Sequence, residues 1–417
     1  MIRGYSRSRE PEIALRIHGQ VFKFGFDLDV YVTCSLIKCY CDLGAVEVAC
    51  QVFEESSNRN VVCWTSLITG FCGHGLVDRG REVFDGMPER NEVAWSAMIA
   101  GYVHNERHEE AIELFCELRD SDCAKLSDSL LVSVLTACAN SGALEEGTWI
   151  HSYLDSKSKG LEEYGLEVGT ALIDFYAKCG LIELARGVFS KMARRDVMAW
   201  SAMIMGLAIN GHSHSAIQVF SEMQRSRIRP NAVTFVGVLT ACSHGGLIDE
   251  GQAYFEDMRK VYRLSPTIEH YGCMVDLLSR AGKTLEAEKL IQSMPMEPDG
   301  AIWGSLLNGC LMHGHTEQGE RVGRQAIELD PQHSGRYVGL ANVYASTGRW
   351  ESAVMVKKMM KQRGVMATPG WSLTEMNGIS CGFVVNDHRH PRHEEIHEML
   401  NYLYNEMVYD RGEVNGL

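Results

Sequence analysis

The strongest constraint on the fold of this chain is a repeat of 31 to 38 residues. Four tryptophans mark it, in the segments VVCWTSLI, EVAWSAMI, VMAWSAMI and GAIWGSLL. The first two, Trp64 and Trp95, lie 31 residues apart, and Trp200 follows Trp95 after 105 residues, which corresponds to three units. Self-similarity at such a period is typical of arrays in which each repeat is one supersecondary unit.

Each repeat carries two helical segments joined by a short polar or glycine turn. In one unit, Trp95, Met98, Ile99 and Tyr102 have the spacing of a single helical face. The segment EEAIELF, which ends at Phe115, supplies the second helix. Because two short helices cannot bury their apolar faces alone, neighbouring units must stack. The sequence therefore predicts an all-α fold, a right-handed α-solenoid of tandem helix-turn-helix repeats.

The register of the repeat predicts where the helical pairs begin. The expected starts are Val30, Val61, Glu92, Asp128, Leu166, Val197, Ala232, Ile268, Gly300 and Ser334. Residues 1–29 are expected to be a partial N-terminal repeat, because MIRGY at the start aligns with MIAGY inside a later first helix. We therefore expect that upstream repeats and any transit peptide are missing from this chain.

Composition excludes several classes of protein. The formal net charge of −14 disfavours a protein that binds polyanions through charge alone. No apolar stretch has the length of a membrane span, and no signal peptide is recognisable. The 14 cysteines form no CxxC pair, so we expect a reducing compartment and no metal or cofactor. Three of them, Cys138, Cys242 and Cys310, share one repeat position and are predicted to be small packing residues.

One segment imitates a catalytic motif. Residues 393–397 read HEEIH, which matches the HExxH pattern of zinc proteases, with His393 and His397 as ligands. A protease would need a third ligand and a cleft, and only 20 residues follow His397. We interpret the match as coincidental, on a solvent-facing helix. The chain is predicted not to be an enzyme, because it contains no other catalytic constellation.

Longer phrases indicate the family. Tetratricopeptide repeats and their RNA-reading relatives both fit the period, but WSAMIxG, YAKCG, RPNAVTFVGVLTACSHGGLIDEG and IEHYGCMVDLLSRAG resemble plant pentatricopeptide repeat proteins of the PLS class. The array would comprise units 30–60, 61–91, 92–127, 128–165, 166–196, 197–231, 232–267 and 268–299. Residues 300–367 resemble the E-type extension, which is tetratricopeptide-like. Residues 368–417 resemble the E+ segment and end before any DYW-type deaminase domain.

The resemblance implies that each repeat reads one base of single-stranded RNA through two side chains, the fifth and the last of a unit. Thr65 with Asn91 and Ser201 with Asn231 would read adenine, and Thr170 with Asp196 would read guanine. Ser96 with Ser127 and Cys34 with Asn60 occupy the same positions, but no base is assigned to them. The residues expected to pack on the faces of bases are Val62, Val93 and Met198, whereas Glu167 stands at that place in the guanine-type unit.

The resemblance also implies a role. The chain would be a sequence-specific adaptor on organelle transcripts, placing a cytidine for C-to-U editing while the tail recruits a DYW-type deaminase or another editing factor in trans. Candidate partner-binding residues in the tail are Trp303, Tyr344, Trp350, Pro369, Gly370 and Trp371. The alternatives are RNA processing, splicing or stability, and a tetratricopeptide-like protein scaffold. The family suggests the mitochondrion, with the chloroplast as the alternative, and neither DNA nor a membrane as a partner.

Overall fold

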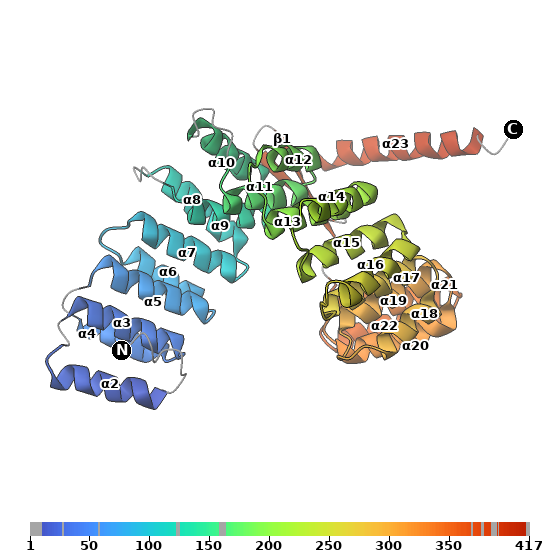
Figure 1. The fold of residues 1–417 in the computed structure, drawn as a ribbon. Coiled ribbons are helices and arrows are strands. Elements are labelled where there is room, and N and C mark those ends of the chain that lie inside the picture. Colours follow the sequence, from blue (N-terminus) through green and yellow to red (C-terminus); the bar gives the residue numbers. More distant parts are fainter. Residues whose placement is uncertain are drawn as a thin grey trace. The chain divides into compact units, whose positions relative to one another are not determined.

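The computed structural model describes residues 11–26, 29–56, 59–121, 126–157, 164–367, 370–376, 379–384, 390 and 392–413. The chain forms two compact units, Met1–His313 and Gly314–Leu417, which are described separately below. Figure 1 shows that paired helices dominate the first. In the part of the chain that the structure describes, no helix has both the length and the apolar character needed to cross a bilayer.

In the first compact unit, α2 (Pro11–Lys23) precedes nine helical pairs or half-pairs. The first helices of the repeats are α3 (Val30–Asp42), α5 (Val61–Gly73), α7 (Glu92–His104), α9 (Asp128–Ser141), α11 (Leu166–Lys178), α13 (Val197–Ile209), α15 (Ala232–Gly245), α17 (Ile268–Arg280) and α19 (Gly300–Met312). The second helices are α4 (Val46–Glu55), α6 (Val77–Asp85), α8 (His108–Arg119), α10 (Leu144–Lys157), α12 (Ile182–Lys191), α14 (Ser213–Arg225), α16 (Ile248–Lys260) and α18 (Thr284–Gln292). Each first helix begins at a residue where the repeat register predicts a start.

Local sequence explains these boundaries. The residue before a first helix is repeatedly Asn or Asp, whose side chain accepts a hydrogen bond from a backbone N–H of the first turn, as at Asn60, Asn91 and Asp196. The turn between the two helices contains a glycine with positive φ, for example Gly75 at 76° and Gly180 at 77°. Glycine enters this left-handed region without the steric cost of a Cβ atom.

The core is built at the junctions between units. Each first helix packs against the next first helix, so that α3, α5 and α7 lie side by side in Figure 1. The ring of Phe84, from a second helix, lies edge-on to Trp95 of the following unit, with centroids 5.0 Å apart. Phe189 and Trp200 repeat this contact at 5.0 Å. The tryptophans that mark the repeat are therefore residues at the junctions between units, which explains their regular spacing.

Glycine sets how closely adjacent first helices approach. A Cβ atom added to Gly206 of α13 would lie 2.7 Å from the Cβ of Ala177 on α11. Gly101 of α7 meets Cys72 of α5 in the same way, with the sulfur 2.4 Å from the added atom. Such distances are far inside van der Waals contact, so a larger residue would force the two helices apart.

The shared cysteine position is confirmed as a packing position. Cys138, Cys242 and Cys310 each have 0% of their surface exposed. Burial raises the pKa of the Cys242 thiol to about 12, since the charged thiolate would lose its hydration. These three residues behave as small apolar side chains.

The second compact unit contains α20 (Thr316–Leu329), α21 (Ser334–Ser346) and α22 (Trp350–Gln362), followed by β1 (Trp371–Met376), β2 (Ile379–Val384) and α23 (His393–Glu413). The two strands pair antiparallel, with Met376 opposite Ile379. The predicted helical solenoid is confirmed, and this hairpin is an addition that the repeat pattern does not predict. The dipeptide Asn-Gly at 377–378, between two apolar segments, is the sequence signal for it.

Candidate nucleic-acid interface

In five of the first helices the second residue is a large apolar side chain that stays exposed, and these five make up the exposed apolar row; Ser129 and Glu167 hold the position in α9 and α11. Val62, Val93 and Met198, predicted to pack on bases, expose 56%, 59% and 50% of their surface. Tyr31 and Val233 hold the same position and expose 83% and 50%. Sequence reasoning missed these two, although the repeat register already placed them in the row. An apolar or aromatic side chain that stays in solvent at one repeated position offers a surface on which a base can stack.

The last residue of a unit has a structural task, because it is the N-cap of the next helix. The Oδ1 atom of Asn91 accepts from the N–H of Ala94 at 3.1 Å, and Oδ1 of Asn60 accepts from Cys63 at 3.0 Å. Asn231 caps α15 in the same way, accepting from Thr234 at 2.9 Å. Because Oδ1 is engaged, the amide nitrogen remains as the group that an asparagine can offer to a ligand.

Aspartate at this position offers the opposite chemistry. The Oδ1 atom of Asp196 accepts from the N–H groups of Met198 and Ala199 at 3.1 and 3.0 Å. The second carboxylate oxygen can only accept a hydrogen bond. The unit end therefore presents a donor when it is Asn and an acceptor when it is Asp.

The fifth residues lie in the wall between successive first helices. Thr65 donates to the carbonyl of Val61 at 2.9 Å, Thr170 to that of Leu166 at 2.7 Å, and Ser201 to that of Val197 at 2.7 Å. With its proton used inside the helix, each hydroxyl can offer a ligand only its lone pairs. Thr65 and Ser201 are 9% and 2% exposed, so a ligand reaches them only at the edge of the groove.

A groove lies beside Thr65. It has a volume of about 430 Å³ and is lined by first helices α3, α5 and α7, with Thr65, Val93, Lys38 and His74 among its residues. The groove thus brings a predicted reading residue of one unit together with the predicted base-packing residue of the next. Its volume falls in the range of about 300–1,000 Å³ found for small-molecule clefts.

A second groove differs in charge. It has a volume of about 340 Å³ between α15, α17 and α19, and carries the carboxylates of Glu269, Asp276 and Asp299. Asp276 accepts from the hydroxyl of Ser243 at 2.5 Å and pairs with Arg280 at 2.8 Å. Three carboxylates in one groove disfavour a phosphate backbone.

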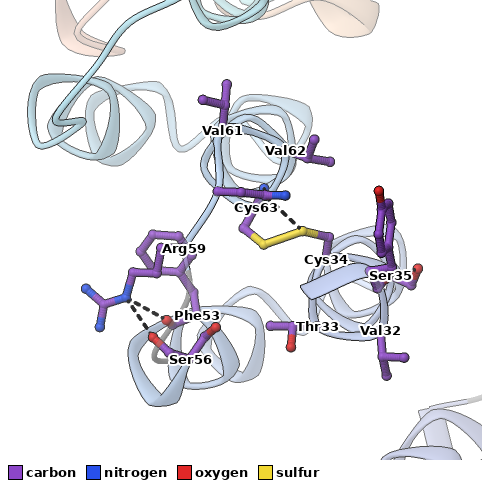
Figure 2. The surroundings of a disulfide bond; sticks show 12 residues. Val32, Thr33, Cys34, Ser35, Phe53, Ser56, Arg59, Val61, Val62 and Cys63 are labelled. Atoms are coloured by element: carbon purple, nitrogen blue, oxygen red, sulfur yellow. Dashed lines mark hydrogen bonds between the residues drawn. A yellow bond between two sulfur atoms is a disulfide. The ribbon is translucent and has the colours of Figure 1, made fainter. Parts of the chain in front are cut away.

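The structure pairs the sulfurs of Cys34 and Cys63 in a disulfide, which joins α3 to α5 (Figure 2). This corrects the expectation that the chain's cysteines are all reduced. This pairing was not predictable from the sequence, because the two residues approach only through the stacking of consecutive units. Asn60, the partner of Cys34 in its unit, caps α5 beside this bond. In the oxidised chain, Cys34 has no S–H group with which to read a base.

The remaining unit without an assigned base has weak side-chain contacts. Ser96 is half-buried on α7. Ser127 precedes α9 without capping it through its side chain, and its hydroxyl lies 3.2 Å from that of Ser129. This pair therefore lacks the capping amide or carboxylate found at Asn60, Asn91, Asp196 and Asn231.

The predicted partner-binding residues separate into two groups. Trp303 is 8% exposed in α19, at the junction position of the other tryptophans, and Tyr344 is 4% exposed with its hydroxyl 2.9 Å from Glu320. Both are packing residues, which corrects their assignment to a partner surface. Trp350 is 66% exposed on α22 and lines a groove of about 390 Å³.

The other three predicted partner-binding residues provide less evidence for a partner surface. Gly370 is exposed. Trp371 begins β1. Pro369 lies outside the described residues.

The HEEIH segment forms the first turns of α23. Within it, Glu395 is 63% exposed and pairs with Arg392, one turn earlier, at 2.5 Å. The described ranges contain no group of three His, Cys, Asp or Glu side chains arranged to hold a metal ion. The glutamate that a zinc protease would use as its base is Glu394, which is exposed on the same turn.

Stacked helical pairs, with an exposed apolar row and a polar capping residue at several unit ends, define an α-solenoid repeat protein. Comparison with family models identifies which one. The PPR repeat model matches residues 32–61, 93–123, 170–197, 233–261 and 269–297, related PPR models match 57–88 and 195–244, and the E motif model matches 313–375. The chain belongs to the pentatricopeptide repeat family, and its E motif is that of the PLS class.

Relatives and solved structures agree with this assignment. A mitochondrial pentatricopeptide repeat-containing protein of Arabidopsis thaliana is 43% identical over 72% of this chain, and a chloroplastic one is 42% identical over 72%. The chain spans 44% and 40% of the lengths of these two relatives. The structure of maize PPR10 in complex with an 18-nucleotide psaJ RNA element superposes with a TM-score of 0.68, at 18% identity, over 88% of this chain and 55% of that one. At this identity the likeness concerns the fold.

Proposed function

We propose that this chain binds single-stranded RNA and reads its bases through the fifth and last residues of its repeats. The observation that carries the proposal is the exposed apolar row from Tyr31 to Val233, which runs beside capped polar residues at one repeat position. Solvent-exposed apolar side chains at a fixed period can stack on successive bases, because every base has an aromatic face. The solved RNA complex of maize PPR10, which shares the fold, supports this proposal.

The hydrogen-bonding groups favour particular bases. In the units of Thr65 with Asn91 and of Ser201 with Asn231, a hydroxyl offers an acceptor and an amide nitrogen offers a donor. Adenine carries the complementary pair, an amino donor beside a ring acceptor. Cytosine carries the same pair on a smaller ring, so selection between these two must come from the depth of the groove.

The guanine assignment follows from the same accounting. Thr170 and Asp196 both offer acceptors, because the Thr170 hydroxyl proton is donated to Leu166 and the Oδ1 atom of Asp196 already accepts from the backbone. Guanine presents two neighbouring donors, an imino and an amino group. Glu167 is exposed where the other units carry an apolar residue, so this unit should contribute less stacking than the adenine units.

The charge of the chain indicates how binding energy is distributed. With a formal net charge of −14, few phosphates can be neutralised, and affinity should depend on salt less steeply than in a basic RNA-binding protein. Base contacts then supply most of the specificity and much of the affinity.

We further propose that the RNA is an organelle transcript and that the role is C-to-U editing, with a deaminase brought in trans by the tail from residue 300 onward. The mitochondrial and chloroplastic relatives and the E motif at 313–375 support an organelle function. Of the tail residues, Trp350 is the best placed to meet a partner, because it is two-thirds exposed. RNA processing or stabilisation would use the same groove without the deaminase.

The proposal is tested by selecting from a random single-stranded RNA pool at physiological salt. The wild-type chain is compared with the double variant Thr65→Ala, Ser201→Ala. The matched control is Thr69→Ala, which removes a hydroxyl that lines the same groove at a position with no predicted reading role. Adenine enrichment at two positions should be lost in the double variant and kept in the control. Equal, unselective binding by all three proteins would contradict base reading and leave a peptide scaffold as the explanation of the groove.

A further inference from the structure

A contact between neighbouring units recurs at the reading position. The fifth residue of one unit faces the third residue of the next first helix. Ser201 meets Thr234 with hydroxyl oxygens 2.7 Å apart, and Cys34 meets Cys63 through the disulfide of Figure 2. A Cβ atom on Gly272 would similarly lie 3.8 Å from Ile302. These pairs come from three different junctions, so the contact is a property of the stacking geometry.

Thr234 is the member of this set with the most hydrogen bonds. Its hydroxyl donates to Oδ1 of Asn231 at 3.0 Å and accepts from the N–H of the same residue at 3.2 Å, which completes a capping box. Its hydroxyl oxygen also lies 2.7 Å from that of Ser201. Thr234 has 0% of its surface exposed, so it cannot itself touch RNA. It nevertheless contacts both predicted reading residues of unit 197–231.

We propose that Thr234 is a positioning residue that fixes which hydrogen-bonding groups Ser201 and Asn231 present to a base. By occupying Oδ1 of Asn231, it holds the amide nitrogen toward the groove as a donor. Because its own proton goes to Asn231, Thr234 can only accept from the Ser201 hydroxyl, which gives the Ser201 proton a second acceptor inside the protein and leaves the Ser201 lone pairs for a base. This inference rests on the proposed base reading and adds a third, buried residue to the pair that the repeat register identifies.

Without Thr234, the hydrogen-bonding groups that Ser201 and Asn231 present to a base would no longer be fixed. Without its hydroxyl, Ser201 can still donate to the carbonyl of Val197, and Asn231 still receives the backbone N–H of residue 234. Ser201, however, becomes free to turn its proton outward, and the amide of Asn231 loses the second donor that fixes its orientation. Each reader could then offer either a donor or an acceptor, so adenine would lose its advantage over uracil.

Unit 61–91 provides an internal control. Its readers, Thr65 and Asn91, offer the same groups as Ser201 and Asn231, but the Thr65 hydroxyl lies within hydrogen-bond distance of two carbonyls, those of Val61 and Val62, which hold its proton without a neighbouring hydroxyl. The third residue of the following helix is Ala94, which has no polar side-chain atom. The preference of unit 61–91 therefore depends on its own two residues, and a substitution at Thr234 should leave it unchanged.

The experiment compares wild type with Thr234→Val and Thr234→Ser in the full chain. Base preference is measured by RNA selection at the two positions that face units 61–91 and 197–231, and thermal stability is measured alongside. We expect Thr234→Val to reduce adenine enrichment at the second position by about threefold to tenfold, the range expected for one net hydrogen bond. Thr234→Ser, which keeps the hydroxyl, should restore most of the enrichment.

The outcomes separate the two proposals. If the wild-type chain shows no enrichment at either position, base reading itself fails. If the wild type is selective at both positions and Thr234→Val keeps this pattern, base reading stands and the positioning role is refuted. An equal loss at both positions in Thr234→Val would show that the substitution weakens the array as a whole, and it would also refute a local role for Thr234.

Discussion

Replacing Gly206 by alanine should drive α11 and α13 apart, although alanine is the better helix former. The change favours the helix by about 1 kcal/mol, because glycine loses more backbone entropy on folding. The new methyl group, however, would lie 2.7 Å from Cβ of Ala177, which is itself only 3% exposed. Relieving this overlap costs about 2–3 kcal/mol, within the range for overpacked cores. We expect a net destabilisation of about 1–2 kcal/mol.

The companion substitution Ala177→Gly isolates the steric cause. Alone it should destabilise by about 1 kcal/mol through helix propensity. In the double variant the two propensity changes cancel and the overlap disappears, so stability should return to within about 0.5 kcal/mol of wild type. Denaturant titration followed by circular dichroism, with hydrogen exchange of α11 and α13 as the local readout, measures all three. Additive effects of the two substitutions would refute the close-approach explanation.

Three further predictions concern the joints of the array. Under oxidising conditions, Cys63→Ala should weaken protection of α3 and α5 by about 3–4 kcal/mol, because a cross-link between residues 29 apart is lost. In reductant the same change should cost much less, since only the packing of one buried sulfur is lost; hydrogen exchange measures both. Burial lowers the pKa of His270 below its ordinary 6.5, so α17 should lose stability as the pH falls below about 6.5, where the unfolded chain binds the proton first; thermal scans should show a weaker pH dependence in His270→Gln. Arg195→Lys should destabilise the array by about 1–2 kcal/mol, because the guanidinium lies 4.6 Å above the Phe189 ring and donates to the Phe189 carbonyl at 2.9 Å. Arg195→Ala should lower the melting temperature further than Arg195→Lys does, and equal melting temperatures of the two variants would contradict this prediction.

The sequence predicts the helical array well because its information is local and repeated. Trp64, Trp95 and Trp200 occur at one place in the unit, and each unit contacts mainly its neighbours. A register read from a few units therefore transfers along the chain. The same argument explains why the exposed row could be extended to Tyr31 and Val233 without new information.

Features that depend on contacts between units were not predictable in this way. The approach of Cys34 to Cys63 and of Ser201 to Thr234 requires the rotation between successive first helices, which no single unit encodes. The repeat register placed Trp303 at the junction position of the other tryptophans, but its location in the E-type extension led to its prediction as a partner-binding residue. The structure buries it at the junction position. Tyr344 is likewise buried, through a hydroxyl contact with Glu320 that joins two helices of the second compact unit.

The hairpin after α22 was missed for a different reason. The repeat pattern ends before β1, so the helical period gives no guidance there. The Asn-Gly dipeptide at 377–378 is a local hairpin signal that lies outside the helical register. A two-stranded hairpin is marginal by itself, and its occurrence depends on context that sequence patterns do not supply.

The central claim is that the last residue of a unit reads a base through the polar atom left over after helix capping. Asn91→Asp tests it most directly, since aspartate caps a helix as well as asparagine does but replaces the outward donor with an acceptor. The measurement is the equilibrium affinity of wild type and variant for two RNAs that differ by adenine or guanine at the position facing unit 61–91. The account predicts that the preference turns from adenine to guanine, by about tenfold in each direction, with unchanged thermal stability. An unchanged preference in a stably folded variant would contradict it.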